Sequence, residues 1–158
     1  MSKKVMGIII FAVLIIIAVV LAVLLTKSEK ELTGTLEEIM EGVYGNIPEE
    51  ELPMMLGNIE LTSENVEGFI GTADVKYTEA IANESMTGSI AHSVVLLRLE
   101  NENDAADVVQ KIKDNVNPRK WICVEASKVI VKNRGSVVVL IMSNDELAPK
   151  LEKNFNNI

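Results

Sequence analysis

The chain has 158 residues, of which 48% are hydrophobic, and its formal net charge is −8. One folded domain fits this length, since domains typically contain about 100–200 residues. The negative charge is concentrated in residues 28–75, where twelve acidic residues accompany a single base, Lys30. Such a surface repels phosphate backbones, so nucleic acid is not expected as a partner. The single cysteine, Cys123, excludes an internal disulfide and a Cys-x-x-Cys motif.

The first element is an uninterrupted apolar run, Val5–Leu25, without a charged or strongly polar side chain. As a helix it would span about 31 Å, which matches the roughly 30 Å hydrocarbon layer of a bilayer. A cleaved signal peptide usually has a shorter apolar run that ends in a small-x-small cleavage site, and this run has no such ending. The sequence therefore predicts that residues 1–27 are an uncleaved signal anchor, held in the lipid bilayer through residues 5–25.

The charges around this span predict a single-pass topology in the cell membrane. Lys3 and Lys4 precede the span, and after Lys30 no base occurs before Lys76. Because basic residues favour the cytoplasmic side, we expect the N-terminus inside the cell. Residues 28–158 then form a soluble extracytoplasmic domain.

Helical and strand patterns alternate along this domain. The capping box Thr35–Glu38 predicts the start of an amphipathic helix, which ends near Gly45. Residues 46–58, with Pro48 and Pro53, are expected to be irregular, and a short helical turn follows over residues 62–71. The later elements are expected in this order: strands at 73–85 and 90–100, a helix at 104–116, strand-like segments at 121–124, 129–132 and 137–142, and a helix at 146–156.

The order of elements after the anchor is therefore α-β-β-α-β-β-α. Tight turns at Met86–Ser89 and Asn133–Ser136 join neighbouring strands, so the strands should pair in antiparallel fashion. We expect an α+β domain with a four-stranded antiparallel sheet and helices on one face, preceded by one transmembrane helix.

Several short segments between Phe69 and Phe155 carry a resemblance to a known group of proteins. They are Tyr77 and Ala80, Met86, Ile90-Ala91-His92-Ser93, Pro118-Arg119-Lys120-Trp121-Ile122, and Val137 to Ser143 before Phe155. In these segments the chain resembles an uncharacterised family of small membrane-tethered or lipoprotein-like extracytoplasmic proteins from Gram-positive bacteria. The resemblance implies an exported α+β domain of unknown function and supplies no catalytic residues. Such relatives are often anchored through a lipidated cysteine, whereas this chain would use its helix.

His92 is the only histidine of the chain, and Cys123 is its only cysteine. His92 lies among the apolar residues of a predicted strand, and Cys123 lies between Ile122 and Val124. We expect both to be packed in the interior, because a lone cysteine with apolar neighbours usually behaves as a small hydrophobic residue. The alternative is a catalytic pair in which His92 activates the Cys123 thiol.

Trp121 follows Arg119 and Lys120 in a segment that begins at Pro118. An indole beside two cations is a candidate contact for a ligand or partner, and packing in the core is the alternative. The chain has no calcium-binding loop, Walker, Gly-x-Ser-x-Gly or Ser-x-x-Lys motif, so we expect no catalytic, cofactor or metal site.

These observations favour a membrane-anchored extracytoplasmic interaction or ligand-binding domain with a protein partner in the cell envelope. We expect that this domain is not an enzyme. The first alternative is a cell-envelope enzyme that uses His92 with Cys123 or with carboxylates of residues 28–75. The second is an accessory subunit of a membrane complex. An open cleft around His92 would favour the enzyme, and an exposed apolar patch would favour the interaction domain.

Overall fold

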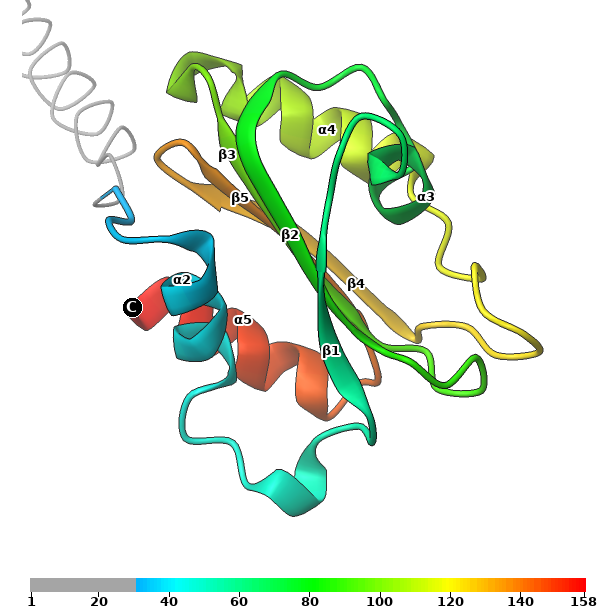
Figure 1. The fold of residues 1–158 in the computed structure, drawn as a ribbon. Helices are drawn as coiled ribbons and strands as arrows, with labels where there is room; N and C mark the ends of the chain where they lie inside the picture. The colour runs from blue at the N-terminus through cyan, green and yellow to red at the C-terminus, as the bar shows by residue number, and fades with distance from the viewer. Residues whose placement is uncertain (1–30) are drawn as a thin grey trace, which may run out of the picture.

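The structure is a computed structural model that describes residues 31–158, so the expected anchor at residues 5–25 lies outside the described residues. Figure 1 shows a five-stranded sheet with the strand order β1-β2-β3-β5-β4, in which all neighbouring strands are antiparallel. The strands are β1 (Leu56–Glu60), β2 (Tyr77–Ser85), β3 (Ser93–Leu99), β4 (Lys128–Arg134) and β5 (Val137–Ser143). Within residues 31–158, no helix has both the length and the apolar character needed to cross a membrane.

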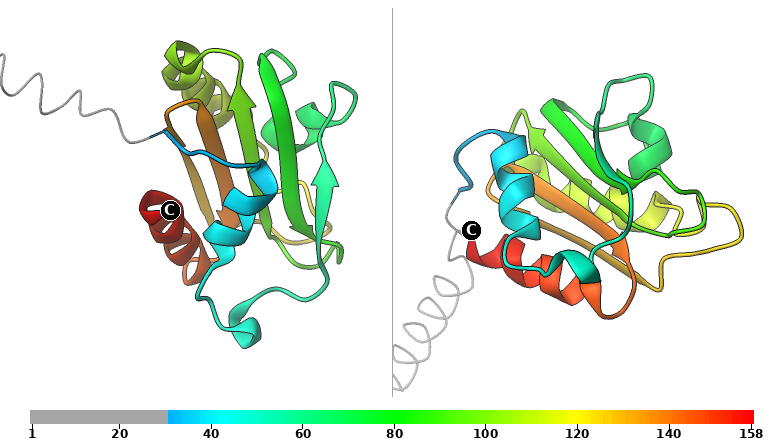
Figure 2. Two further views of the ribbon diagram at one scale, coloured as in Figure 1. Left: turned by 60° about the vertical axis from the view of Figure 1, so that its left-hand side comes forward. Right: turned by 60° about the horizontal axis from the view of Figure 1, so that its bottom comes forward.

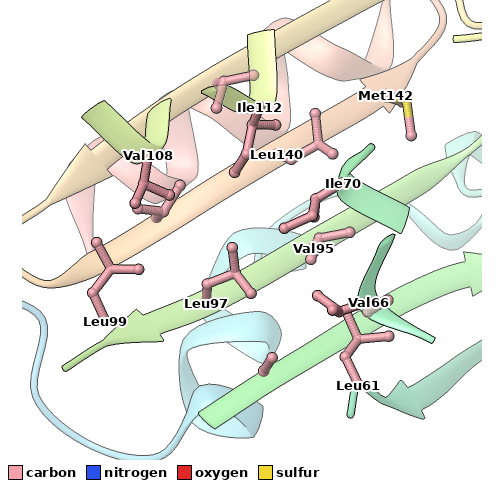
Figure 3. Close-up of a cluster of buried hydrophobic side chains, with 14 of the residues drawn as sticks. Leu61, Val66, Ile70, Val95, Leu97, Leu99, Val108, Ile112, Leu140 and Met142 are labelled. Carbon is pink, nitrogen blue, oxygen red and sulfur yellow. The ribbon is translucent and has the colours of Figure 1, made fainter. Parts of the chain in front are cut away.

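Helices cover both faces of this sheet (Figures 1 and 2). The helices are α2 (Leu36–Tyr44), α3 (Val66–Ile70), α4 (Ala105–Asn115) and α5 (Leu147–Asn157), with short 3-10 turns η1 (Glu49–Glu51) and η2 (Glu102–Asp104). Helices α2 and α5 pack on one face and share a buried cluster that includes Leu36, Val94 and Phe155. Helices α3 and α4 pack on the other face, where Ile70 and Ile112 lie in the second cluster, drawn in Figure 3.

The expectation of a four-stranded sheet covered on one face is therefore wrong. The two central strands explain the second layer of helices, because β3 and β5 are apolar on both sides. In β3, Val94 and Leu96 point toward α2 and α5, whereas Val95 and Leu97 point toward α3 and α4. Strands that are apolar on both faces must be covered on both faces to remove that surface from water.

The fifth strand, β1, lies in a segment that the sequence suggested was mostly irregular. It pairs only with β2, from Leu56 opposite Ser85 to Glu60 opposite Ile81. As an edge strand it is partly exposed along its length, so it lacks the strong apolar pattern of a central strand. Conversely, the strand-like segment 121–124 forms no strand and belongs to the loop between α4 and β4.

Helix α2 begins where its capping box predicts. Thr35 Oγ1 accepts a hydrogen bond from the Glu38 amide at 3.2 Å, and Glu38 Oε2 accepts one from the Thr35 amide at 3.0 Å. These bonds satisfy backbone donors that a helix start leaves free. The helix then buries Leu36, Ile39 and Val43 against the sheet. The N-terminal part of the described chain is therefore packed as part of the domain.

Candidate interaction surface

His92 is fully buried beneath α2, as its apolar neighbours predicted. It immediately precedes β3 and lies opposite Ser143 at the end of β5. Its Nδ1 is 2.9 Å from Ser143 Oγ, and its Nε2 is 2.7 Å from the Tyr44 hydroxyl. Burial lowers the pKa of His92 to about 4, so the ring is neutral near pH 7. Burial also raises the pKa of Tyr44, which stays a neutral phenol.

A neutral imidazole suits this position, because one ring nitrogen donates a hydrogen bond and the other accepts one. The two hydroxyls take the complementary roles. The hydrogen-bond partners of His92 are thus hydroxyls on either side of the ring rather than acidic side chains. With no exposed surface, the imidazole lies out of reach of a substrate in solution.

Cys123 is exposed, so the expectation that it is buried is wrong. It lies in the loop between α4 and β4, with a backbone φ of 60°. This loop packs through Trp121 on the face of α3 and α4, whereas His92 lies on the opposite face, against α2. The fold therefore separates the two members of the hypothetical catalytic pair. Among residues 31–158, no group of three or more histidine, cysteine or acidic side chains is arranged to hold a metal ion.

Lys120 and Trp121, two of the predicted contact residues, converge on one carboxylate of β2. Lys120 Nζ lies 2.6 Å from Glu84 Oε2, and Trp121 Nε1 donates a hydrogen bond to Glu84 Oε1 at 3.1 Å. The ammonium also lies 4.1 Å from the centre of the Phe69 ring, a cation–π contact. Burial lowers the pKa of Lys120, and the contact with Glu84 opposes this effect.

Arg119, the third predicted residue, points to solvent and pairs with Glu125 at 3.2 Å. The three residues therefore do not form one surface. Lys120 and Trp121 fasten the loop between α4 and β4 to the sheet, and Arg119 remains on the outside of that loop.

A different set of residues forms the most exposed apolar surface at this end of the domain. Four side chains, which we name the loop tip, are exposed by 62–74%: Met54, Met55, Met86 and Ile122. They belong to three loops, which precede β1, follow β2 and precede β4. Of the six large hydrophobic side chains exposed in residues 31–158, four thus gather at one end of the sheet. Exposed apolar patches on monomeric proteins often mark interaction sites, so the loop tip is the candidate contact surface of the described domain.

Hydrogen bonds hold the three loops of the tip together. The Met86 amide donates to the Met55 carbonyl at 3.0 Å, and the Ile122 amide donates to the Gly88 carbonyl at 3.0 Å. The Ser85 hydroxyl donates to the Met54 carbonyl at 2.9 Å. The apolar side chains are therefore presented by a cross-linked framework instead of by three independent loops.

The loop tip was not predicted from the sequence. Its clearest signal was the pair of adjacent methionines directly after Pro53, in a stretch otherwise rich in acids. Met55 also adopts a φ of 56°, a left-handed conformation that usually costs a non-glycine residue about 1–2 kcal/mol. The tertiary structure holds this residue in the strained turn while its side chain remains in solvent.

At the opposite end of the sheet, Arg98 holds the first described residues of the chain. Its guanidinium donates to the carbonyls of Leu32 at 3.2 Å and Gly34 at 2.6 Å, and its Nε donates to Glu79 at 3.3 Å. Glu31 accepts a hydrogen bond from the Ser136 hydroxyl at 3.2 Å. We name residues 31–35 the strap, because these contacts fix them to the sheet.

Comparison of the chain with protein-family models, with curated proteins and with solved structures finds no match. The resemblance to membrane-tethered proteins of Gram-positive bacteria therefore stays a prediction.

Proposed function

We propose that this protein is a membrane-anchored extracytoplasmic interaction domain that binds a protein partner through its loop tip. The observation that carries the proposal is the exposure of Met54, Met55, Met86 and Ile122 on three hydrogen-bonded loops. A framework held by backbone hydrogen bonds favours binding, because little backbone entropy is lost when a partner covers the apolar side chains that it carries.

The strap supports an orientation for this domain. Leu25, the last residue of the apolar run, precedes Glu31 by six residues, a chain length that reaches at most about 20 Å. The strap end of the sheet would therefore lie near the bilayer. The loop tip lies at the other end of β3 (Figure 1), roughly 20 Å farther along the strands. In this orientation the tip is presented to a partner away from the lipid.

The geometry favours binding over catalysis. An enzyme using His92 would need the imidazole to reach a substrate, and the ring is fully buried between two hydroxyls. Cys123 is accessible, but its loop packs on the other face of the sheet. The alternative, an accessory subunit that acts through its anchor, stays a prediction, because the anchor lies outside residues 31–158.

Site-specific photocrosslinking in native membranes tests the proposal. A photoreactive amino acid at position 122 should capture a discrete protein, and introducing Met55→Glu into the same chain should abolish that product. The matched control places the photoreactive group at position 158, which is 42% exposed in the native chain and lies beyond α5. The same product from both positions, or a product from position 122 that survives Met55→Glu, would contradict a specific contact through the tip.

A further inference from the structure

Strand β1 uses only one of its two hydrogen-bonding edges. It stands first in the strand order and pairs only with β2, without a bulge. Two hydrogen bonds of 3.0 Å mark bonded positions at the ends of this pairing, from the Met86 amide to the Met55 carbonyl and from the Leu61 amide to the Ala80 carbonyl. Bonded and non-bonded pairs alternate along an antiparallel ladder. The backbone groups of the positions between the bonded ones therefore point away from β2: Leu56, Asn58 and Glu60.

Most of these outward groups have no partner in the described part of the chain. The Glu60 carbonyl accepts a hydrogen bond from the Asn65 side chain at 3.2 Å, which closes the edge just before α3. Within residues 31–158, the amides and carbonyls of Leu56 and Asn58 form no hydrogen bond. In Figure 2, β1 forms the margin of the sheet, and the described chain places no strand beyond it. Such an edge is a template for pairing with another chain.

The other edge strand, β4, carries side chains that oppose such pairing. It contains Lys128 and Lys132, both exposed, and lysines on an edge strand discourage the addition of another strand. Strand β1 contains neither lysine nor proline, and Gly57 at its second position has no side chain. The edge of β1 is therefore the one that is open to an added strand.

The start of β1 is continuous with the loop tip. Met54 and Met55 directly precede Leu56. The Met86 side chain lies along the strand, with its Cγ and Sδ 3.5 Å from the point that a Cβ on Gly57 would occupy. Residues opposite each other in a sheet project their side chains from the same face. An apolar side chain on an added strand, opposite Gly57, would therefore lie beside Met86.

The other end of β1 is acidic. A cleft of about 250 Å³ lies there between α2, β1 and β2, and its lining includes Glu37, Glu60 and Glu79. Glu79 pairs with Arg98 at 3.3 Å, whereas no base of the described residues forms an ion pair with Glu37 or Glu60. Glu60 lies opposite Ile81, which faces α2 and α5. A basic side chain opposite Glu60 would project from this same face, toward the cleft.

We propose that the partner of the loop tip adds an extended segment to β1 as a further antiparallel strand, with an apolar residue opposite Gly57 and a basic residue opposite Glu60. This inference rests on the proposed function and names the chemistry of the partner's contact segment. The segment's backbone bonds to Leu56 and Asn58, and its two side chains give specificity. A second copy of β1 does not fit, because residues 31–75 contain no lysine or arginine and like charges opposite each other are destabilising.

Binding of a synthetic peptide to the full chain in neutral detergent micelles tests this inference. The probe is a capped, fluorescent peptide with the sequence Lys-Val-Thr-Val-Leu, whose lysine lies opposite Glu60 and whose second valine lies opposite Gly57 in antiparallel pairing. We expect its affinity, measured by fluorescence anisotropy, to fall at least tenfold in Asn58→Pro. Proline removes the outward amide of Asn58 and leaves the bonds between β1 and β2 intact. The matched control Asn58→Ala keeps that amide and should bind the peptide as the native chain does.

A second pair of variants tests the charge. Glu60→Lys should also weaken binding at least tenfold, whereas Glu41→Lys, the same change at an exposed position of α2, should leave it unchanged. Because Glu60→Lys alters no backbone bond, it decides the question even where circular dichroism shows that Asn58→Pro does not fold. Equal weakening by Glu60→Lys and Glu41→Lys would show attraction to overall charge only and would overturn the proposal.

Two further outcomes would overturn the added strand. One is the absence of peptide binding to the native chain, and the other is equal binding by folded Asn58→Pro and Asn58→Ala. The photocrosslink from position 122 separates this inference from the proposed function. A product that persists in folded Asn58→Pro would support docking through the tip and overturn the added strand, whereas the absence of any product from the native chain would count against the proposed function itself.

Discussion

Acidification should destabilise this domain through the buried imidazole of His92. Its pKa is about 4 in the folded protein because of burial, against an ordinary value of 6.5 in the unfolded chain. Between these values the unfolded state binds a proton that the folded state does not, so the free energy of unfolding falls as the pH falls. The stabilisation that comes from the low pKa of His92 is fully present above pH 6.5 and is lost as the pH drops to about 4. At about 1.4 kcal/mol per pKa unit, the loss is roughly 3 kcal/mol.

The hydrogen bonds around the ring give this loss its physical cause. Protonation would turn both ring nitrogens into donors, so the hydroxyls of Tyr44 and Ser143 would both have to accept. It would also place a charge where the ring has no exposed surface. Part of the loss is expected to appear as opening of the contact between α2 and the sheet, because Tyr44 ends α2.

Urea unfolding of the native chain and of His92→Gln, measured from pH 4 to pH 7, isolates this effect. Glutamine keeps hydrogen-bonding capacity but does not titrate, and the carboxylates contribute equally to both proteins. The stability difference between the two proteins should therefore shrink by roughly 3 kcal/mol on acidification. Because the chain has one histidine, its ring signals also report the pKa directly by NMR. A measured pKa near 6.5, or a stability difference independent of pH, would refute the reasoning.

Three further predictions concern the strap, the loop fastening and the thiol. Arg98→Ala should lower the free energy of unfolding by about 2–3 kcal/mol and allow proteases to cut within residues 31–35; unchanged stability and cleavage would contradict the strap. Glu84→Gln should lower the free energy of unfolding by roughly 1–3 kcal/mol, since Lys120 loses its counter-charge in a mostly buried site. The same variant should increase hydrogen exchange in the α4–β4 loop, and unaltered exchange would argue against the fastening. Cys123 should react with iodoacetamide equally fast in native and denatured protein, and with a membrane-impermeant maleimide on intact cells; protection on intact cells would reverse the proposed topology.

The sequence correctly predicted those features that depend only on a few neighbouring residues. The capping box at Thr35 located the start of α2, and the turns at Met86–Ser89 and Asn133–Ser136 indicated the two hairpins. The burial of His92 followed from the apolar neighbours on its strand face. In each of these cases the residues that determine the structure are neighbours in the sequence.

The layer arrangement was mispredicted although its signal was present. The run Val94–Leu97 and the strand Val137–Ser143 are apolar on both faces, which requires helices on both sides of the sheet. Strand β1 had a weaker signal, because an edge strand needs neither strict alternation nor strong β-forming residues. Its position is determined instead by pairing with β2, which is separated from it by α3 and its flanking loops.

The candidate site depended on contacts between residues far apart in the sequence. Trp121 and Lys120 suggested a binding surface because the side chains that they contact in the fold are far away in the sequence. Glu84, from a strand more than thirty residues earlier, satisfies both side chains. Ile122 and Cys123 directly follow these two residues and are exposed. Their apolar neighbours in the sequence therefore did not indicate burial. The contact that occupies the predicted site is thus the one that holds the loop on which Ile122 and Cys123 are exposed.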